Sequence, residues 1–151
     1  MNITWSFKKF NDLGTDELYD ILSLRNKVFV VEQSCVYLDT DGIDKESWHL
    51  CGWDNDGLVA YARIIPPGMV YPEASIGRVV SDPDHRSKGA GKLLMNKAIE
   101  IVYGQFNALG IRIGAQLYLE AFYSNLGFTR VSEVYLEDGI PHIKMLHKKL
   151  V

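Results

Sequence analysis

Residues 86–91 read Arg-Ser-Lys-Gly-Ala-Gly, between a β-branched run at residues 76–80 and a helical pattern from Lys92 to Tyr103. A glycine-rich turn between a strand and a helix leaves several backbone N–H groups unpaired, and the positive end of the helix dipole backs them. Such a turn suits an anion such as a pyrophosphate. The stretch therefore predicts a strand, a phosphate-binding turn and a helix, and with them a phosphate-bearing cofactor.

Two common phosphate-binding motifs do not fit this turn. A Walker loop requires Gly-x-x-x-x-Gly-Lys-Ser/Thr, but Leu93 follows Gly91-Lys92 and position 86 holds arginine. A dinucleotide fingerprint requires Gly-x-Gly-x-x-Gly straight after the first strand, and neither the spacing nor the position is met. We therefore expect neither a nucleoside triphosphatase nor a dinucleotide-dependent enzyme.

The remaining pattern is Arg-x-x-Gly-x-Gly/Ala, with Pro83 three residues before Arg86. It resembles the cofactor motif of the GCN5-related N-acetyltransferase superfamily, which binds the pyrophosphate of acetyl-coenzyme A (acetyl-CoA). Residues 115–128 resemble that superfamily's other motif, which ends in Tyr-x-x-x-Gly-Phe, with Tyr123 on its tyrosine. Together the motifs imply an acetyl-CoA-dependent N-acetyltransferase, whose acceptor amine, on a small molecule or protein, attacks the thioester directly.

The residues around Tyr123 allow two interpretations. Ala115, Leu119, Phe122 and Tyr123 recur at helical spacing, and Gly127 marks a helix end. A tyrosine on such a stripe usually belongs to the core. Its position after the phosphate turn favours the role that the superfamily gives it, in which the tyrosine donates a proton to the leaving thiolate.

One domain accounts for the chain of 151 residues, because no linker, repeat or low-complexity stretch divides it. The hydrophobic pattern predicts an α/β fold with a mixed, mostly antiparallel central sheet flanked by helices, which is how the acetyltransferase (GNAT) fold runs. Strands are expected near residues 3–7, 48–53, 58–65, 75–81, 111–113, 128–135 and 140–146, and helices near residues 15–32, 92–103 and 115–126.

The resemblance covers nearly the whole chain and narrows to the ElaA subfamily. The segments that carry it are residues 24–33, 37–44, 60–63, 76–79 and 135–143, together with His49. Ser81 departs from the superfamily, which usually has an apolar strand residue there. The departure weakens a side-chain contact with the cofactor and leaves the backbone pairing in place.

The resemblance also implies a set of cofactor contacts. Val79, Val80 and Ser81 would pair in β fashion with the pantetheine arm. The pyrophosphate would lie on the backbone N–H groups of Arg86, Ser87, Lys88, Gly89, Ala90, Gly91 and Lys92. Gln116 stands where the superfamily often has asparagine, and it would contact the cofactor.

The base that deprotonates the amine is open between two residues. Glu32 follows Val30-Val31, and an apolar neighbourhood there would raise the pKa of its carboxyl. A carboxylate that pairs with a cation or caps a backbone group is equally compatible with that position. A histidine such as His142 serves either as a base at neutral pH or as a hydrogen-bonding core residue.

Charged residues interrupt several apolar segments. Asp39, Asp41 and Asp44 alternate through a loop but lack the terminal glutamate of a calcium-binding EF-hand, so we expect them to line a polar acceptor site or to solvate a turn. The arginines at positions 25, 63 and 78 fit two interpretations equally: recognition of a substrate carboxylate, or internal ion pairs.

Composition narrows the partners. The net charge of −3, without a basic stripe, argues against nucleic-acid and membrane-surface partners. No apolar run approaches the roughly 20 residues of a membrane span and no signal peptide is recognised, so we expect a cytoplasmic protein. Cys35 and Cys51 lack ligand spacing, which predicts reduced thiols and no metal. The expected partner is a small-molecule or peptide amine, and the oligomeric state, a homodimer included, stays open.

Two other functions are compatible with these residues. Acyl-homoserine-lactone synthases share the fold and an Arg-x-x-Val-Phe segment like residues 25–29, but they are longer, and this chain carries the acetyltransferase phosphate turn. A non-catalytic module that binds acetyl-CoA and regulates a partner is the second. Tyr123 argues against it, because a sensor needs no acid for a leaving group.

Overall fold

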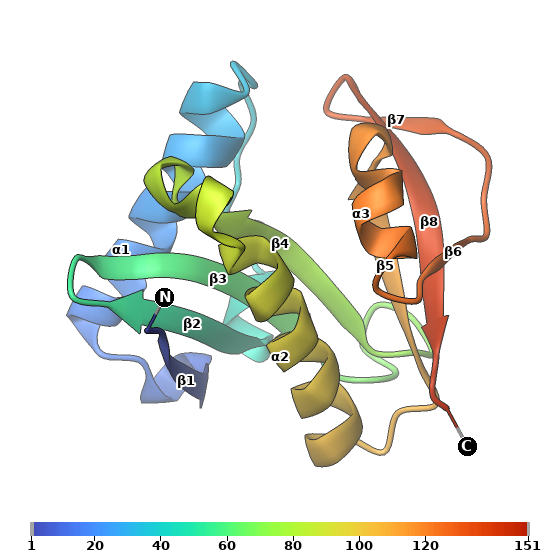
Figure 1. Cartoon of the computed structure of the whole chain (residues 1–151), viewed down its shortest axis with the longest axis horizontal. Coiled ribbons are helices and arrows are strands. Elements are labelled where there is room, and N and C mark those ends of the chain that lie inside the picture. Colours follow the sequence, from blue (N-terminus) through green and yellow to red (C-terminus); the bar gives the residue numbers. More distant parts are fainter. Residues whose placement is uncertain (1, 151) are drawn as a thin grey trace.

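The computed structural model describes residues 2–150, in which strands and helices alternate (Figure 1). The main elements are β1 (Thr4–Lys9), α1 (Thr15–Arg25), β2 (Trp48–Asp54), β3 (Gly57–Ile65), β4 (Ser75–Ser81), α2 (Ala90–Gln105), β5 (Gly110–Gln116), α3 (Glu120–Ser124), β6 (Thr129–Arg130), β7 (Tyr135–Glu137) and β8 (Ile140–Lys148). A π-helix, Asn26–Glu32, extends α1, and 3₁₀ helices lie at Phe10–Asp12, Ile43–Glu46, Pro83–Lys88 and Leu117–Leu119. None of the helices within residues 2–150 has both the length and the apolar character that a bilayer span requires.

The first sheet is antiparallel, in the order β1-β2-β3-β4, and different helices cover its two faces. Successive residues of a strand point to opposite faces. Tyr61 of β3 packs in one buried cluster with Ile21 of α1, whereas Ala62 packs in another with Leu94 of α2. This alternation therefore places α1 and α2 on opposite sides of the sheet.

A β-bulge interrupts β4 at the edge of the first sheet. Tyr61 pairs with Val80 and Arg63 pairs with Gly77, so two residues of β4 face one residue of β3. Arg78, inside the bulge, has a φ of 48°, a left-handed value that is uncommon for a residue with a Cβ. A bulge leaves backbone groups unpaired and bends its strand. This one lies on the strand that was predicted to pair with the pantetheine arm.

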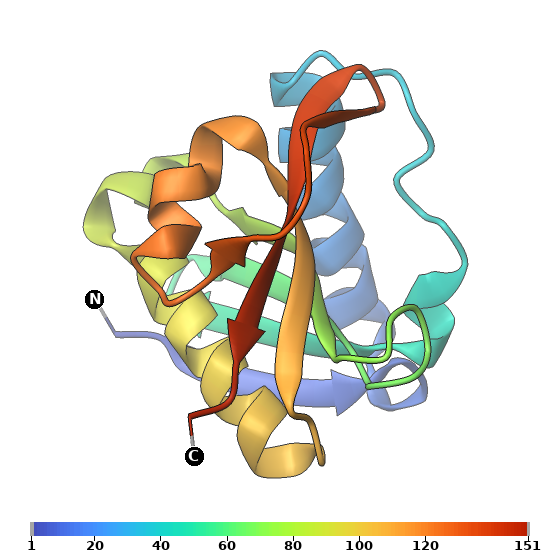
Figure 2. The same ribbon diagram turned by 90° about the vertical axis from the view of Figure 1, so that its right-hand side faces the viewer.

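The second sheet has the order β5-β8-β6, with β7 also paired to β8. It joins the first sheet near the start of β4, where Ala74 forms a parallel bridge with Ile111 and the Arg112 N–H donates to the Ala74 carbonyl at 2.9 Å. Beyond that point β4 and β5 diverge (Figure 1). In Figure 2, α3 lies to one side of β5 and β8, and α1 lies to the other.

The mixed α/β architecture agrees with the prediction, but the helix expected over residues 115–126 begins too early. β5 runs to Gln116, a 3₁₀ turn follows, and α3 is only five residues long. Ala115 continues the alternate burial of Ile111 and Ile113, which is a strand period. Ala115 and Tyr123 are spaced like residues on one face of a helix, but Ala115 belongs to β5 and Tyr123 belongs to α3.

The strand expected over residues 128–135 is confirmed only near its two ends. Only Thr129–Arg130 and Tyr135–Glu137 pair with β8. Between them, the Ser132 hydroxyl accepts the Lys144 N–H at 2.8 Å, so a side chain replaces the backbone carbonyl that a continuous ladder would use. The chain therefore leaves β8 and returns to it.

Candidate active site

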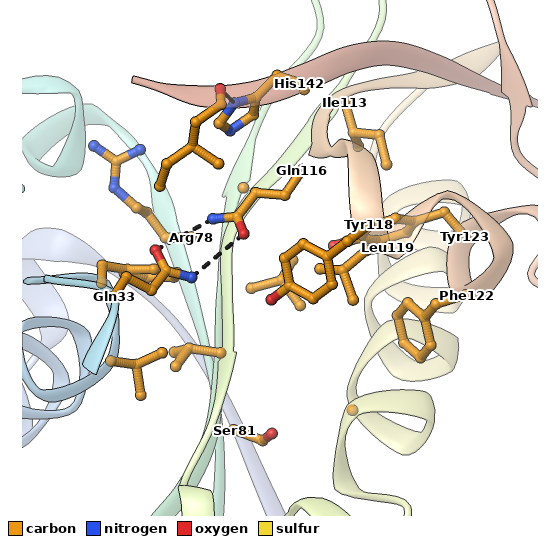
Figure 3. Close-up of a pocket in the computed structure, with 18 of the residues that line it drawn as sticks. Gln33, Arg78, Ser81, Ile113, Gln116, Tyr118, Leu119, Phe122, Tyr123 and His142 are labelled. Carbon is orange, nitrogen blue, oxygen red and sulfur yellow. Dashed lines mark hydrogen bonds between the residues drawn. The ribbon is translucent and has the colours of Figure 1, made fainter. Parts of the chain in front are cut away.

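A cavity of about 570 Å³ fills the space between the diverging ends of β4 and β5. Residues 76–81 of β4 form one wall, and Ile113, Gly114 and Gln116 of β5 form another (Figure 3). The π-helix, the start of α2, α3 and the β7–β8 turn complete it. Because diverging strands leave their facing backbone edges without a partner strand, the cleft can receive an extended chain along β4.

Most of the residues predicted to act on the cofactor line this cavity. They are Val79, Val80, Ser81, Arg86, Gly89, Gly91, Lys92 and Gln116, together with the proposed catalytic residues Glu32, Tyr123 and His142. Ser87, Lys88 and Ala90 do not line it, since Ser87 and Lys88 are exposed and Ala90 is fully buried. The fold thus brings together segments from both ends of the chain.

The turn before α2 is built to present backbone N–H groups. The Asp82 carboxylate caps it by accepting a backbone N–H at 2.9 Å, and the 3₁₀ helix Pro83–Lys88 leads to Gly89 at a φ of 79°. The first N–H groups of the helix that follows have no intrahelical acceptor. A Cβ at Gly91 would approach no atom closer than Phe122, at 3.7 Å, so the space above this turn is open. An anion can therefore come close to the backbone here.

Glu32 is bound to Arg86 in a two-point ion pair. Arg86 Nη1 donates to Oε2 at 3.0 Å and Nη2 donates to Oε1 at 2.5 Å. The Arg86 guanidinium lowers the pKa of Glu32, and the slight burial that would raise it is outweighed. The expected rise in pKa is therefore wrong. A carboxylate that is ionised and doubly hydrogen-bonded to a guanidinium is a weak base.

Tyr123 belongs to the core and to the cavity at once. Its side chain is 6% exposed, and its ring packs edge-on against Phe122 and Phe128, with centroid distances of 5.1 and 5.8 Å. The hydroxyl makes no hydrogen bond with any residue from 2 to 150, and the residue lines the cavity. Burial raises the pKa of Tyr123, so the hydroxyl keeps its proton at neutral pH and can donate it.

Gln116 forms hydrogen bonds across the cavity with Gln33, which was not predicted to be a site residue. Its side-chain amide and that of Gln33 exchange two hydrogen bonds of 3.3 Å each, between β5 and the end of the π-helix (Figure 3). An amide has both donors and acceptors, so the pair can open without leaving a charge uncompensated. Gln116 therefore contacts the middle of the cleft.

His142 projects from β8 into the cavity, with its side chain 8% exposed (Figure 3). Its Nδ1 lies 2.7 Å from the Ile140 carbonyl, which can only accept a hydrogen bond, so Nδ1 carries a proton. In the neutral ring the lone pair is then on Nε2, which is 3.4 Å from Glu137 Oε2. This geometry gives a base whose charged form a neighbouring carboxylate stabilises.

Three arginines and three aspartates form a buried ion-pair cluster beside the cavity. Its members are Arg25, Arg63, Arg78, Asp39, Asp41 and Asp44. Arg25 has no exposed surface; its Nε lies 2.6 Å from Asp39 Oδ2 and its Nη1 lies 2.7 Å from Asp44 Oδ1. The three positive and three negative charges balance.

The ion-pair cluster shows which of the predicted roles the three aspartates and the three arginines have. None of the aspartates lines the cavity, and each pairs with arginines. Asp39 and Asp44 are 4% and 6% exposed, whereas Asp41 is exposed and also accepts the Ile43 N–H of its turn at 3.0 Å. Burial opposes ionisation of Asp44, but the hydrogen bonds and charges of Arg25 and Arg63 outweigh it and lower its pKa. Internal ion pairs therefore account for the arginines.

Asp54, Asp56 and His85 form a separate group near the β2–β3 hairpin. His85 Nε2 lies 3.0 Å from Asp54 Oδ2 and 3.9 Å from Asp56 Oδ2. The Asp56 side chain is 81% exposed. Exposed acidic groups of this kind are common in proteins without a bound ion.

Comparisons with known proteins agree with this geometry. A family model described as an acetyltransferase (GNAT) domain matches residues 26–149. A UPF0039 protein of Synechocystis is 45% identical over 149 residues, which cover 98% of this chain and 97% of that protein. The crystal structure of Escherichia coli ElaA is similar with a TM-score of 0.90 at 41% identity, covering 97% of this chain and 100% of that one. An acyl-CoA N-acyltransferase from Pseudomonas aeruginosa has the same TM-score at 40% identity, covering 97% and 99%.

Proposed function

Because the chain belongs to the GNAT acetyltransferase family and to its ElaA group, we propose that it transfers the acetyl group of acetyl-CoA to a primary amine. The observation that carries the proposal is Tyr123, whose hydroxyl is protonated and which lines the cavity. The amine attacks the thioester directly, and no acyl-enzyme is formed.

The cosubstrate fits the residues of the cleft. Its pantetheine arm pairs with β4 along Val79–Ser81, beyond the bulge, where the edge of the first sheet is free of β5. The pyrophosphate lies on the backbone N–H groups of the turn, with the Lys92 ammonium beside it. Gly89 and Gly91 support this placement, because neither has a side chain that would fill the approach.

The chemistry needs one proton acceptor and one proton donor. His142 takes the proton of the incoming ammonium on Nε2, and Glu137 stabilises the imidazolium that results. The amine nitrogen then bonds to the acetyl carbon, the C–S bond breaks, and the nitrogen releases its second proton to solvent to leave a neutral amide. The thiolate receives the Tyr123 proton, which solvent afterwards replaces. Backbone N–H groups freed by the β4 bulge would stabilise the oxyanion.

We assign the base to His142 rather than to Glu32. The Glu32 carboxylate is held by Arg86, which keeps it ionised and occupies both of its oxygens. Glu32 acts instead as a positioning residue, because it fixes the guanidinium that borders the phosphate end of the cavity.

Two measurements test the proposal. Calorimetry with CoA should show metal-independent binding that Gly89→Glu weakens by about 10-fold or more, since an acidic side chain there repels the pyrophosphate. A thiol-release assay with acetyl-CoA should then detect turnover with polyamines, amino acids, aminoglycosides or peptides. Tight CoA binding without turnover on any amine would support the non-catalytic module, and wild-type affinity in Gly89→Glu would contradict the assigned turn.

A further inference from the structure

Lys144 of β8 carries a charge that no carboxylate balances within residues 2–150. Its Nζ donates a hydrogen bond to the Tyr71 hydroxyl at 2.7 Å, and it lies 5.3 Å from the Tyr71 ring centroid and 4.9 Å from that of Tyr135. Burial disfavours the ammonium, but its contacts with the two tyrosines outweigh burial and raise the pKa of Lys144. The group is therefore a fixed cation with donors to spare.

The strand register places this cation beside the proposed base. Lys144 pairs with Gly114, and His142 pairs with Gln116. Residues two apart on a strand share a face and stand about 7 Å apart. Tyr135 bridges them, since its ring stacks on His142 with centroids 5.8 Å apart and also lies under the Lys144 ammonium.

Gly114 opens the cavity wall toward Lys144. It lines the cavity and is exposed, and a Cβ there would stand 3.4 Å from Lys144 Nζ and 2.9 Å from the Tyr135 hydroxyl. On β4, Gly77 also lines the cavity, and a Cβ there would meet nothing within 4 Å. Gly77 thus leaves open floor on the β4 side of the cavity, while the Tyr135 hydroxyl and the Lys144 ammonium border the wall at Gly114.

The other cations that line the cavity are either paired with carboxylates or, in the case of Lys92, assigned to the pyrophosphate. Arg78 is paired with Asp39 and Asp41, and Arg86 is paired with Glu32. Farther along β5, Arg112 is paired with Glu73 at 3.0 Å. At the opposite end of the open floor, Glu137 faces His142 and favours an ammonium. The part of the cavity that would hold the acceptor amine is therefore negative at Glu137, beside His142, and positive at Lys144, two residues along β8.

We propose, on the basis of the amine acetylation inferred above, that the acceptor is an amino acid whose carboxylate binds Lys144 while its distant amino group lies at His142. His142 and Lys144 stand two positions apart on one strand, which favours zwitterions with several methylene groups between the two ends over α-amino acids. A carboxylate here receives charge-assisted hydrogen bonds from Lys144 and meets no unpaired acidic group at that end.

The test compares matched acceptors and matched variants. Acetylation kcat/KM is measured for 5-aminopentanoate, pentylamine, 1,5-diaminopentane and glycine, with wild-type protein, Lys144→Gln and Lys148→Gln. Lys148 is an exposed lysine on the same strand, so its variant controls for the loss of one positive charge. Wild-type protein and Lys148→Gln should prefer 5-aminopentanoate over pentylamine by about 10-fold or more, and Lys144→Gln should lose that preference.

A second variant guards against a merely structural role of the lysine. Tyr71→Phe removes only the hydroxyl that fixes Lys144, so it should reduce the preference while thermal stability stays near that of the wild type. Turnover of amines without a carboxylate preference, or a preference that survives in Lys144→Gln, would overturn the inferred site and leave the acetyltransferase reaction intact.

Calorimetric titration of 5-aminopentanoate into the CoA-saturated protein separates the two proposals. Binding that depends on Lys144 without any acetyl transfer would support the carboxylate site and refute the proposed reaction. Absence of both binding and transfer for 5-aminopentanoate would refute the carboxylate site.

Discussion

Removing the charge of Asp39 should destabilise the protein more than any exposed charge change, because Asp39 is the least exposed aspartate of the ion-pair cluster and is shared by two arginines. Its side chain is 3% exposed and lies 2.6 Å from Arg25 Nε and 2.9 Å from Arg78 Nε. The Tyr37 hydroxyl donates to it at 2.6 Å. In Asp39→Asn the shape is kept, but an amide NH₂ must face at least one of these donors.

The size of the loss follows from what the partners retain. Arg25 still pairs with Asp44 at 2.7 Å, and Arg78 still lies 3.3 Å from Asp41, so neither guanidinium is left bare. The cluster as a whole nevertheless keeps three arginines against two aspartates, and such an uncompensated buried charge costs about 3–5 kcal/mol of unfolding free energy. For a domain of this size that corresponds to a fall in Tm of about 6–20 °C.

Thermal unfolding followed by circular dichroism, together with urea titration at neutral pH, measures this loss. Asp20→Asn, an exposed change on α1, is the matched control and should stay within about 0.5 kcal/mol of the wild type. A free energy for Asp39→Asn within about 1 kcal/mol of the wild type would refute the claim that the cluster holds this side of the cavity together.

Three further predictions concern single groups. Glu32→Gln should raise the KM for acetyl-CoA by no more than about 5-fold, since an exposed ion pair contributes little binding energy, and it should leave kcat unchanged. A large loss of kcat would instead assign the base to Glu32. His142→Asn should lower kcat by about 10²-fold because the proposed base is removed, and a kcat like that of the wild type is the contrary result. The pKa of Asp44 is lowered on folding, so the ionised Asp44 carboxylate contributes its full stability above the ordinary aspartate pKa of 3.8. This contribution is lost as the pH falls through the pKa of Asp44 in the folded state. Tm should therefore drop steeply only in that acid range, and the drop should be smaller in Asp44→Asn.

The sequence was most informative where structure depends on neighbours in the chain. The conformation of the turn before α2 follows from Asp82, Pro83 and the glycines after them, because capping and left-handed φ values are local properties. The strand Ser75–Ser81 has the predicted bounds. The bulge inside it was not predicted, since it depends on how β4 meets β3.

The parts of the site that were missed depend on pairs that are distant in sequence. Glu32 and Arg86 are 54 residues apart, so the residues beside Glu32 gave no sign of its cation. Lys144 and Tyr71 are separated by 73 residues, and Gln33 and Gln116 by 83. For the aspartates near position 40, the residue types were noticed, but only the fold shows which arginine each one meets.

The proposed acid role of Tyr123 is tested most directly by Tyr123→Phe, which keeps the packing of the ring and deletes the hydroxyl. With any amine that the wild type acetylates, kcat should fall by about 10²–10⁴-fold while the calorimetric Kd for CoA stays within about 2-fold. Tyr118→Phe, at an exposed tyrosine that lines the same cavity, is the control and should retain turnover. A Tyr123→Phe enzyme with wild-type kcat would contradict the proposal and make this tyrosine a core residue only.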